Sequence, residues 1–335
     1  MRRAGKRAVC LIARQQANSC MSVDTSTESD SLQSTENHRQ QTGLVIAHHG
    51  STLLVETADQ QLRECHSRKS AGPLVTGDQV IVETGERDDI IVRRLPRRSE
   101  LARPDSRGKS RIIAANIDQI LIVISPRPAF KEALIDRYLV AAELTGITPV
   151  IVLNKVDLLT SEDAAAVKQR LAVYEQIGYR LVEVSAKVAD GFDALHLVLN
   201  GRNNIVVGQS GVGKSSLINA LLPEVDARVG DVSSATNKGT HTTTTARLYH
   251  LPQRDGNIID SPGIREFGLW QVGPTDLAAG FREFNTFRPH CKFRDCLHRQ
   301  EPGCAVRTSV QTGGISPQRY KSYLNLLESL QQDNH

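Results

Sequence analysis

The stretch GQSGVGKSS at residues 208–216 has the residue types of a loop that binds phosphate groups. It matches the pattern G-x-x-x-x-G-K-[ST], in which glycines let backbone N–H groups converge on phosphates without a clash from Cβ atoms. Lys214 would neutralise the β- and γ-phosphates during catalysis, and Ser215 would be a ligand of Mg²⁺. A helix that begins at Gly213 would direct its positive end at the same anion. The residues expected to contact the nucleotide here are Gly208, Gln209, Ser210, Gly211, Val212, Gly213, Lys214, Ser215 and Ser216.

A second motif, NKVD at residues 154–157, lies upstream of this loop and resembles the guanine-reading N-K-x-D motif of the GTPase superfamily. The carboxylate of Asp157 could accept two hydrogen bonds from guanine, from N1–H and from the N2 amine. Adenine offers neither donor, so ATP would leave a buried carboxylate unpaired at a cost of about 1–3 kcal/mol. The sequence SAK at 185–187 resembles the loop that backs the base. The residues expected to contact guanine are Asn154, Lys155, Asp157, Ser185, Ala186 and Lys187.

A third motif, DSPG, begins at Asp260 and ends at Gly263, and it matches the D-x-x-G motif of the same superfamily. Asp260 would hold Mg²⁺ through water, and the Gly263 N–H would bind the γ-phosphate. The segment 239–245, GTHTTTT, lies where a first switch belongs, and a Thr hydroxyl there would complete the Mg²⁺ shell. Thr242 and Thr243 are the candidates. The alternative is a polar loop without a ligand role.

The hydrolytic step departs from the pattern of Ras-like enzymes, which place a Gln after the glycine of D-x-x-G to orient water. This chain has Ile264 at that position, and its side chain has no hydrogen-bonding group. His241, the one imidazole of the switch segment, is our candidate for positioning the water; an exposed loop His is the alternative. We therefore expect slow turnover by the isolated protein.

Three cysteines and a histidine follow in the spacing Cys291-x4-Cys296-x-His298-x5-Cys304. Three thiolates and one imidazole are a complete ligand set for tetrahedral zinc, which indicates one structural ion per chain and no open catalytic position. Cationic residues around the ligands indicate either RNA phosphate contacts or solvated charge. They are Arg282, Arg288, His290, Lys292, Arg294 and Arg299.

Strands and helices of an α/β domain must position the nucleotide motifs. Continuous apolar runs are typical of buried parallel strands, and each motif follows such a run, at the strand ends where open sheets bind ligands. The predicted strands are 119–125, 148–153, 179–185 and 203–207, and the predicted helices are 130–144, 162–177 and 192–199.

The regions before and after the α/β domain differ from it in their patterns of apolar, turn and charged residues. Short apolar runs between residues 43 and 94, separated by turn residues, predict a small β-barrel, either of the oligonucleotide-binding (OB) type or generic. Residues 93–111 form a basic connector, either solvated or in contact with a phosphate backbone. A helix is expected from Pro317 to about Leu330, with an apolar stripe that packs into a core.

Composition limits the class of protein. The chain has 335 residues, a net charge of +4 and 4% aromatic residues, which allows two or three globular domains and is compatible with a nucleic-acid partner. No apolar run approaches the roughly 20 residues of a membrane span, so a soluble cytoplasmic protein without a membrane partner is expected.

The order of the motifs is unusual, because the base-reading motif precedes the phosphate loop. Together with the barrel, the Cys₃His set and the stretches GTHTTTT and DSPGIREFGLW (260–270), this order resembles the circularly permuted GTPases known as the RsgA or YjeQ family. The resemblance covers about residues 43–330. It implies a circularly permuted P-loop GTPase domain at 98–270, with an OB-type barrel at 41–97 before it and a zinc-binding domain with a C-terminal helix at 271–335 after it. Residues 1–40 lie outside the resemblance, and their richness in Ser, Thr, Gln, Asn and Asp predicts a disordered tail.

The resemblance also implies a function. The protein would bind GTP and GDP, with Mg²⁺ and zinc as cofactors. It would act as a monomer in late maturation of the small ribosomal subunit, hydrolyse GTP when docked on rRNA, and then dissociate. Alternatives are an RNA-binding placeholder in which hydrolysis only resets affinity, a large-subunit factor, or a protein with an inactive nucleotide site. Because the zinc segment follows Gly263, we further expect the second switch to shift the zinc knuckle on RNA.

Overall fold

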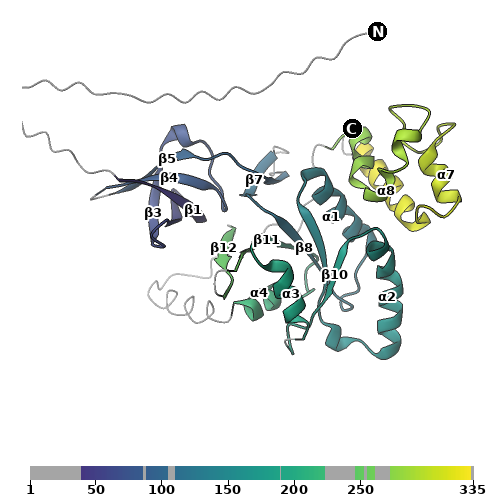
Figure 1. Cartoon of the computed structure of the whole chain (residues 1–335), viewed down its shortest axis with the longest axis horizontal. Helices are drawn as coiled ribbons and strands as arrows, with labels where there is room; N and C mark the ends of the chain where they lie inside the picture. The colour runs from purple at the N-terminus through teal and green to yellow at the C-terminus, as the bar shows by residue number, and fades with distance from the viewer. Residues whose placement is uncertain are drawn as a thin grey trace, which may run out of the picture. The chain divides into compact units, whose positions relative to one another are not determined.

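The computed structural model describes residues 39–85, 88–104, 110–188, 190–222, 246–252, 255–260 and 272–332 (Figure 1). The predicted tail at 1–40 lies outside this part except for its last two residues, and the switch segment 239–245 lies outside it altogether. Among the described helices, none is long and apolar enough to cross a membrane.

Five strands close into a barrel, as the short apolar runs predict. Strand β1 pairs with β2 on one side and with β4 on the other; β3 and β5 run parallel, and β5 returns antiparallel to β4. Alternate side chains point inward and form a core of buried residues that includes Val45, Val55 and Ile91. The strands are β1 (Arg39–His49), β2 (Thr52–Thr57), β3 (Leu62–Ser67), β4 (Gln79–Thr84) and β5 (Asp89–Arg94).

The region predicted to be a basic connector, either solvated or in contact with a phosphate backbone, contains two strands instead. Strands β6 (Glu100–Pro104) and β7 (Ser110–Ala115) pair as a hairpin. Just before them, the guanidinium of Arg97 forms two bonds of 2.6 and 2.8 Å with the carboxylate of Asp78 in the barrel. The two side chains are 4% and 0% exposed, so Arg97 is an internal ion-pair partner and is not available to a phosphate backbone.

The nucleotide domain is a parallel sheet with helices on both faces, as predicted. Its parallel strands are ordered β10-β9-β8-β11-β13, and β12 adds an antiparallel edge. The strands are β8 (Gln119–Ile124), β9 (Thr148–Leu153), β10 (Arg180–Glu183), β11 (Asn203–Val207), β12 (Arg247–His250) and β13 (Asn257–Asp260). The helices are α1 (Glu132–Thr145), α2 (Ser161–Gln176), α3 (Phe192–Leu199) and α4 (Lys214–Leu221).

The sheet is buried on both faces, which explains its uninterrupted apolar runs. All six residues of β8 are buried. Its even-numbered isoleucines pack with residues of α1 and α2, whereas Leu121 and Val123 pack with residues of α3 and α4. Helix α2 begins as predicted, since the hydroxyl of Thr160 accepts a hydrogen bond from the Asp163 N–H.

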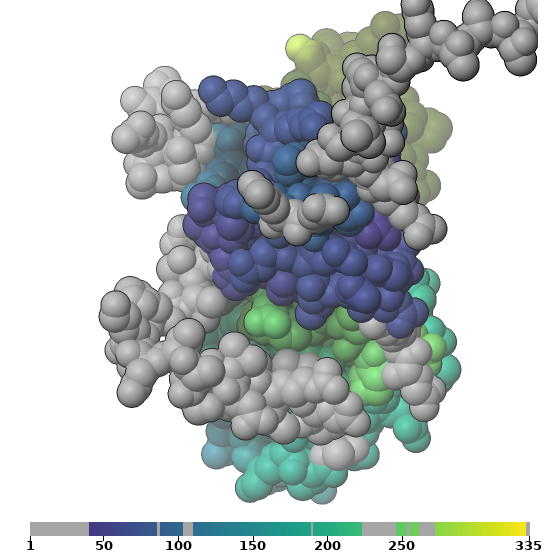
Figure 2. Space-filling view, turned by 90° about the vertical axis from the view of Figure 1, so that its left-hand side faces the viewer, coloured from purple at the N-terminus to yellow at the C-terminus, as the bar shows by residue number. Residues whose placement is uncertain are grey.

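The barrel and the nucleotide domain share one continuous sheet, because β1 pairs with β12 through Ala47 and Arg247. In Figure 2 the green surface of the β12 region adjoins the purple and blue surface of the barrel. Beside this pairing, the hydroxyl of Thr76 in the barrel donates to the carbonyl of Ala246, at 2.8 Å. Strand β12 is therefore held by both parts.

The C-terminal region forms a compact module of short helices around an aromatic core, which we call the zinc module (residues 272–332). Phe281, Phe284 and Tyr323 are buried together, with ring centroids 5.0–5.4 Å apart. The predicted stripe of the last helix contributes to this core. The elements are α6 (Pro274–Leu277), η5 (Ala278–Gly280), η6 (Arg282–Phe284), η7 (Arg288–His290), α7 (Ala305–Gln311) and α8 (Pro317–Gln332). The predicted domain limits at 97/98 and 270/271 stay predictions.

A buried ion-pair network fastens the zinc module to α1. Arg319 of α8 lies 2.5 Å from the Asp136 carboxylate of α1 and 2.7 Å from the Glu283 carboxylate of η6. Arg319 and Asp136 are both fully buried. Burial alone would lower the pKa of Arg319, but the two carboxylates raise it, so the guanidinium stays charged. The stripe prediction for this helix missed Arg319, because it considered apolar residues only.

Candidate nucleotide site and metal centre

Two glycines shape the phosphate loop between β11 and α4. Gly208 (φ 144°) and Gly213 (φ 92°) adopt backbone conformations that favour glycine. A Cβ on Gly208 would clash with the carbonyl oxygen of Val123, and a Cβ on Gly213 would lie 2.5 Å from the side-chain nitrogen of Asn154. The glycines thus let the loop pack directly against β8 and against the base-reading motif.

Lys214 is the first residue of α4 and lies across the loop. Its ammonium group donates to the carbonyls of Gly208 and Gln209, both at 2.8 Å. Burial raises the pKa of Asp260, the last residue of β13, and the charge of Lys214 opposes that shift. A cation and a carboxylate therefore share the carboxyl end of the sheet, where the exposed Ser215 is the second residue of α4.

Asn154 ties the loops of the site together. It is fully buried at the end of β9. Its amide nitrogen donates to the Val212 carbonyl at 3.0 Å, and its amide oxygen accepts from the Ala186 N–H at 3.2 Å. The side chain therefore links the phosphate loop with the 185–187 loop, and these three segments meet although they are far apart in sequence.

The neighbouring Lys155 adopts a left-handed backbone conformation (φ 64°) that turns its side chain over the phosphate loop. Its ammonium group donates to the Gly211 carbonyl at 2.5 Å and to the Arg127 carbonyl at 3.1 Å. Lys155 thus bridges the phosphate loop and the segment that precedes α1.

Asp157 is oriented by a serine from the adjacent loop. The Ser185 hydroxyl donates to one carboxylate oxygen of Asp157 at 2.6 Å. Ser185 is fully buried, whereas Asp157 is exposed. One carboxylate is therefore fixed in place with its free face toward solvent, as the reading of a base edge requires. Lys187 is exposed beside it.

The structure brings most of the predicted nucleotide residues together, and four lie outside its described part: His241, Thr242, Thr243 and Gly263. Ile264 lies outside it as well. The hydroxyl ligands of Mg²⁺ and the group that positions water therefore stay predictions.

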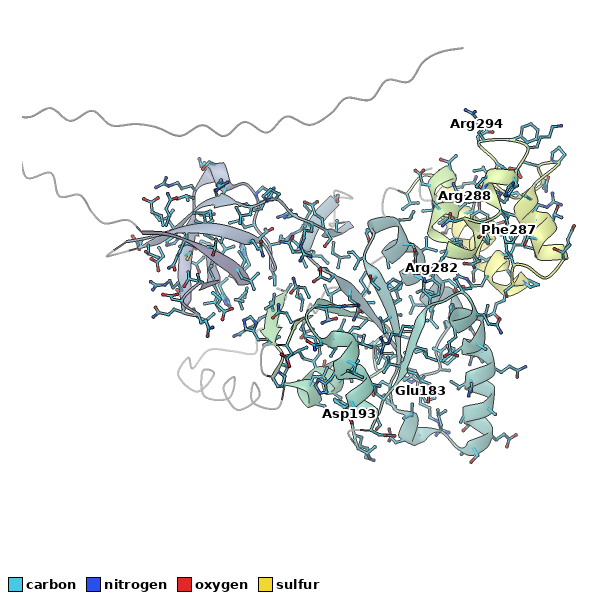
Figure 3. The ribbon with its side chains drawn as sticks, in the orientation of Figure 1. Glu183, Asp193, Arg282, Phe287, Arg288 and Arg294 are labelled. Atoms are coloured by element: carbon cyan, nitrogen blue, oxygen red, sulfur yellow. The ribbon has the colours of Figure 1, made fainter. Side chains whose placement is uncertain are left out.

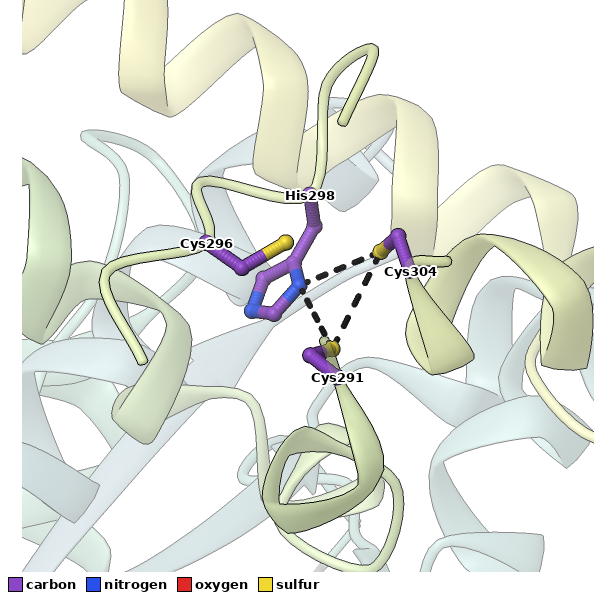
Figure 4. A group of neighbouring side chains, drawn as sticks. All are labelled: Cys291, Cys296, His298 and Cys304. Carbon is purple, nitrogen blue, oxygen red and sulfur yellow. Dashed lines mark hydrogen bonds between the residues drawn. The ribbon is translucent and has the colours of Figure 1, made fainter. Parts of the chain in front are cut away.

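The four predicted metal ligands converge in the zinc module (Figure 4). Their ligand atoms all lie within 4.8 Å of one another. His298 Nδ1 is 3.6 Å from Cys291 Sγ and 3.4 Å from Cys304 Sγ, and the two sulfurs are 4.0 Å apart. Tetrahedral zinc, with bonds of about 2.3 Å to sulfur and about 2.0–2.1 Å to nitrogen, places its ligand atoms about 3.5–3.8 Å apart. The cluster fits one zinc ion.

The protonation chemistry of this cluster also suits a divalent cation. Burial lowers the pKa of His298, which keeps the imidazole in the neutral form that binds metals. Burial raises the pKa of Cys296 to about 12 and also raises that of Cys304. A coordinated cation deprotonates such thiols outright, so the buried cysteines would become thiolates on binding.

Residues that the spacing pattern did not predict hold the ligands in place. The Glu301 carboxylate accepts hydrogen bonds from the N–H groups of Leu297, Arg299 and Gln300. From α8, the hydroxyls of Tyr320 and Tyr323 donate to the carbonyls of His298 and Leu297 at 2.5 and 2.7 Å. The sequence signal for Glu301 is its position inside the ligand loop, whereas the helical spacing of Tyr320 and Tyr323 predicts only an apolar stripe.

The basic residues near the cluster divide into two groups. Arg282 pairs with Glu143 of α1 at 2.6 Å and lies over the ring of Tyr179, so it belongs to the junction. Figure 3 places Arg294 at the outer end of the module and Arg282 on the side of α1. Lys292 and Arg294 are exposed and remain available to a partner.

Comparisons with known proteins agree with this arrangement. Residues 94–270 match the family described as RsgA GTPase. The chain is 52% identical over 307 residues to the small ribosomal subunit biogenesis GTPase RsgA of a Pseudomonas aeruginosa strain, covering 91% of this chain and 90% of that one. A Pseudomonas fluorescens protein of the same name is 52% identical over 88% of each chain.

Solved structures resemble the fold over nearly its whole length. YjeQ from Thermotoga maritima superposes with a TM-score of 0.73 at 30% identity, covering 87% of this chain and 99% of that one. YloQ, described as a circularly permuted GTPase, superposes with a TM-score of 0.72 at 26% identity, covering 90% and 99%. The permuted order of the nucleotide motifs is therefore a feature of the shared fold.

Proposed function

The chain belongs to the RsgA GTPase family, and from this premise we propose that it hydrolyses GTP in the late maturation of the small ribosomal subunit. The observation that carries the proposal is the likeness, over 91% of the chain, to a protein named for biogenesis of that subunit. The assembled nucleotide site supports it, because the phosphate loop, Asn154 and Asp157 meet at one end of the sheet.

We assign the nucleotide contacts from the geometry of the described loops. Asp157, oriented by Ser185, would accept the N1–H and N2 amine of guanine. Lys214 already lies across the phosphate loop, and its ammonium would turn from the loop carbonyls to the β- and γ-phosphates. Asn154 and Lys155 would keep the base-reading segment against the phosphate loop. The remaining contacts would come from backbone groups of 208–216, of 185–187 and of Gly263.

The hydrolytic step would rely on residues of the two switch segments. Mg²⁺, when bound, would neutralise charge that develops on the phosphate oxygens. Ser215 and Thr242 or Thr243 would hold it directly, and Asp260 would do so through water; such oxygen donors are those that Mg²⁺ prefers. His241 would orient the attacking water in place of the Gln that Ras-like enzymes use.

The zinc module and the barrel would carry the docking on rRNA. The exposed Lys292 and Arg294 of the zinc module could contact phosphates, and zinc would have a structural role only, since its ligand set is full. We further propose a monomer that works in the cytoplasm, is slow alone, is stimulated by the docked subunit, and leaves after hydrolysis.

The test is GTP turnover by the full chain with and without purified small subunits. We expect a clear increase in kcat in their presence, and no increase with large subunits. Asp157→Ala should weaken GDP binding by about 10- to 100-fold, because a charged hydrogen-bond pair to guanine is worth about 1.5–3 kcal/mol. An equal turnover with and without small subunits would overturn the proposed function.

A further inference from the structure

One histidine joins the barrel to the nucleotide domain. His250 ends β12, and its two ring nitrogens face acceptors from different parts of the chain. Nε2 lies 2.6 Å from a carboxylate oxygen of Glu56 in barrel strand β2. Nδ1 lies 2.7 Å from the amide oxygen of Asn257, the first residue of β13. The His250 and Glu56 side chains are 27% and 10% exposed, so this contact is only partly shielded from water.

The hydrogen bonds beyond Asn257 determine which group donates and which group accepts at each of these contacts. The Asn203 amide nitrogen donates to the backbone carbonyl of Asn116 at 2.7 Å, and a carbonyl can only accept. The Asn203 amide oxygen is thereby left to accept from the Asn257 amide nitrogen, at 2.7 Å. The Asn257 amide oxygen then faces His250, so the imidazole must donate from Nδ1. Nε2, on the other side of the ring, faces the Glu56 carboxylate.

We call the connected side chains of Glu56, His250, Asn257 and Asn203 the relay. It ends at the strands that carry the nucleotide motifs. Asn203 is the first residue of β11, which runs into the phosphate loop at Gly208. Asn257 is the first residue of β13, which ends at Asp260. A side chain of the barrel is therefore connected, through three side chains, to the starting points of both strands.

A second set of contacts reaches the same strands through the backbone. Ala47 of β1 is paired with Arg247 of β12, and Arg247 is paired with Asp260. The Thr76 hydroxyl holds the carbonyl of Ala246, one residue before β12. Because paired strands move together, a displacement of the barrel edge would be transmitted to Asp260 at one end of β13 and to Asn257 at the other.

We propose that Glu56, His250 and Asn257 are positioning residues that couple the occupancy of the barrel to GTP turnover. A partner that binds the barrel would shift β2 and β12, and the relay would pass that shift to the strands holding the phosphate loop and Asp260. This inference rests on the proposed function, because it takes the small subunit as the barrel's partner. The coupling needs no contact between the partner and the nucleotide.

The experiment compares Glu56→Gln, His250→Gln and the double variant with the wild type. The control is Glu64→Gln, which removes the same charge from an exposed position of neighbouring strand β3. For each full-length protein, kcat and KM for GTP are measured with and without purified small subunits, together with subunit binding. Hydrogen exchange of peptides that contain residues 203–207 and 257–260 is measured without subunits.

We expect each relay variant to lose about 2- to 30-fold of the stimulation in kcat, the range found for residues that modulate coupling between sites. Subunit binding and KM should change less than kcat. The double variant should lose no more stimulation than the single variant with the larger loss, because the two residues act through the contact between them. Exchange in β11 and β13 should rise in the relay variants and stay unchanged in the control.

The outcomes separate this inference from the proposed function. If the wild type is stimulated and the relay variants are stimulated equally, the relay is overturned. A loss of stimulation that merely follows a loss of subunit binding overturns it as well. If small subunits do not stimulate the wild type, the proposed function fails. The relay is then judged by hydrogen exchange: unchanged exchange in β11 and β13 overturns it, and a selective rise supports the physical connection.

Discussion

The barrel and the zinc module are both joined to the nucleotide domain, but by different chemistry. At the zinc-module junction, Arg319 and Asp136 are fully buried and Glu283 completes the network. Aromatic rings enclose the guanidinium, which lies 4.7 Å from the centroid of Phe281 and 5.7 Å from that of Tyr174. Separating these groups would leave charges unpaired in an apolar environment, which is costly.

The barrel junction contains one enclosed ion pair among its described residues, between Arg97 and Asp78, and is otherwise built from backbone contacts and apolar packing. Ile46 of β1 belongs to the apolar core of the nucleotide domain, and the buried amide of Asn116 donates to the Gly77 carbonyl at 2.8 Å.

Beside these contacts lie the strand bridge, the hydroxyl on a backbone carbonyl, and the partly exposed contact between His250 and Glu56. Water can replace either partner of the contact between His250 and Glu56, so its net contribution is small, about 0.5–1.5 kcal/mol. That contact can therefore change at low cost.

The difference indicates that the zinc module and the barrel have different roles. The zinc module is fixed on α1, and the barrel can respond to a partner. The expectation that the second switch shifts the zinc knuckle stays a prediction, and the junction limits it: a shift must carry α1 along or break the Arg319 network. Four experiments test this contrast, beginning with the largest expected effect.

Removal of zinc should abolish the rigid junction altogether. Structural zinc contributes about 10–16 kcal/mol of apparent binding energy at such sites, and the tyrosines of α8 hold the ligand loop. A chelator, or Cys304→Ser, should eliminate the near-UV circular dichroism of the module while the far-UV signal of the sheet persists.

The matched control for zinc removal is Cys65→Ala, which changes a buried cysteine of the barrel away from the cluster. It should leave the zinc content at one ion per chain. A near-UV signal that survives complete loss of zinc would show that the module folds without the metal.

Breaking the buried network should be the next largest effect. Arg319→Ala leaves Asp136 buried without its partner and should lower the free energy of unfolding by about 3–5 kcal/mol. The measurement is urea denaturation of the full chain. Arg299→Ala is the control, because its pair with Glu328 spans 3.7 Å with both side chains well exposed, and it should cost less than about 1 kcal/mol. Equal losses of stability in the two variants would contradict the difference expected between buried and exposed ion pairs.

A close backbone approach at the same junction offers a smaller perturbation. A Cβ on Gly280 of η5 would lie 2.5 Å from a methyl group of Val140 and 3.0 Å from its carbonyl oxygen in α1. Gly280→Ala should therefore cost about 1–3 kcal/mol through overpacking, read from the urea midpoint. Gly273→Ala, whose Cβ would meet only the movable carboxylate of Asp276, should cost less. A fully tolerated Gly280→Ala would mean that the junction is looser than its burial indicates.

The smallest effect on stability is expected at the barrel junction. Glu56→Gln keeps the size of the side chain and removes the carboxylate from one partly exposed contact, so the free energy of unfolding should fall by less than about 1 kcal/mol. Thermal or urea denaturation measures it. A loss as large as that of Arg319→Ala would contradict the view that this junction is adjustable.

The nucleotide motifs and the metal ligands could be predicted because their chemistry depends on short spacing. The phosphate loop needs Gly208 to leave room for the Val123 carbonyl and Gly213 to leave room for the Asn154 side chain, and the Cys₃His set lies within 14 residues of chain. The buried strands could be predicted from continuous apolar runs, because both faces of the sheet are covered. The barrel could be predicted from the rhythm of its strands and turns.

The junctions could not be predicted in this way, because their partners are far apart in sequence. The sequence places Arg97 in a basic connector and gives no signal for Arg319. Only the fold brings Arg97 to Asp78 and Arg319 to Asp136. Glu56 and His250 are 194 residues apart, and neither belongs to a motif. Local spacing specifies what a segment can bind, whereas the burial of a charge and the identity of its partner depend on which surfaces the folded chain presses together.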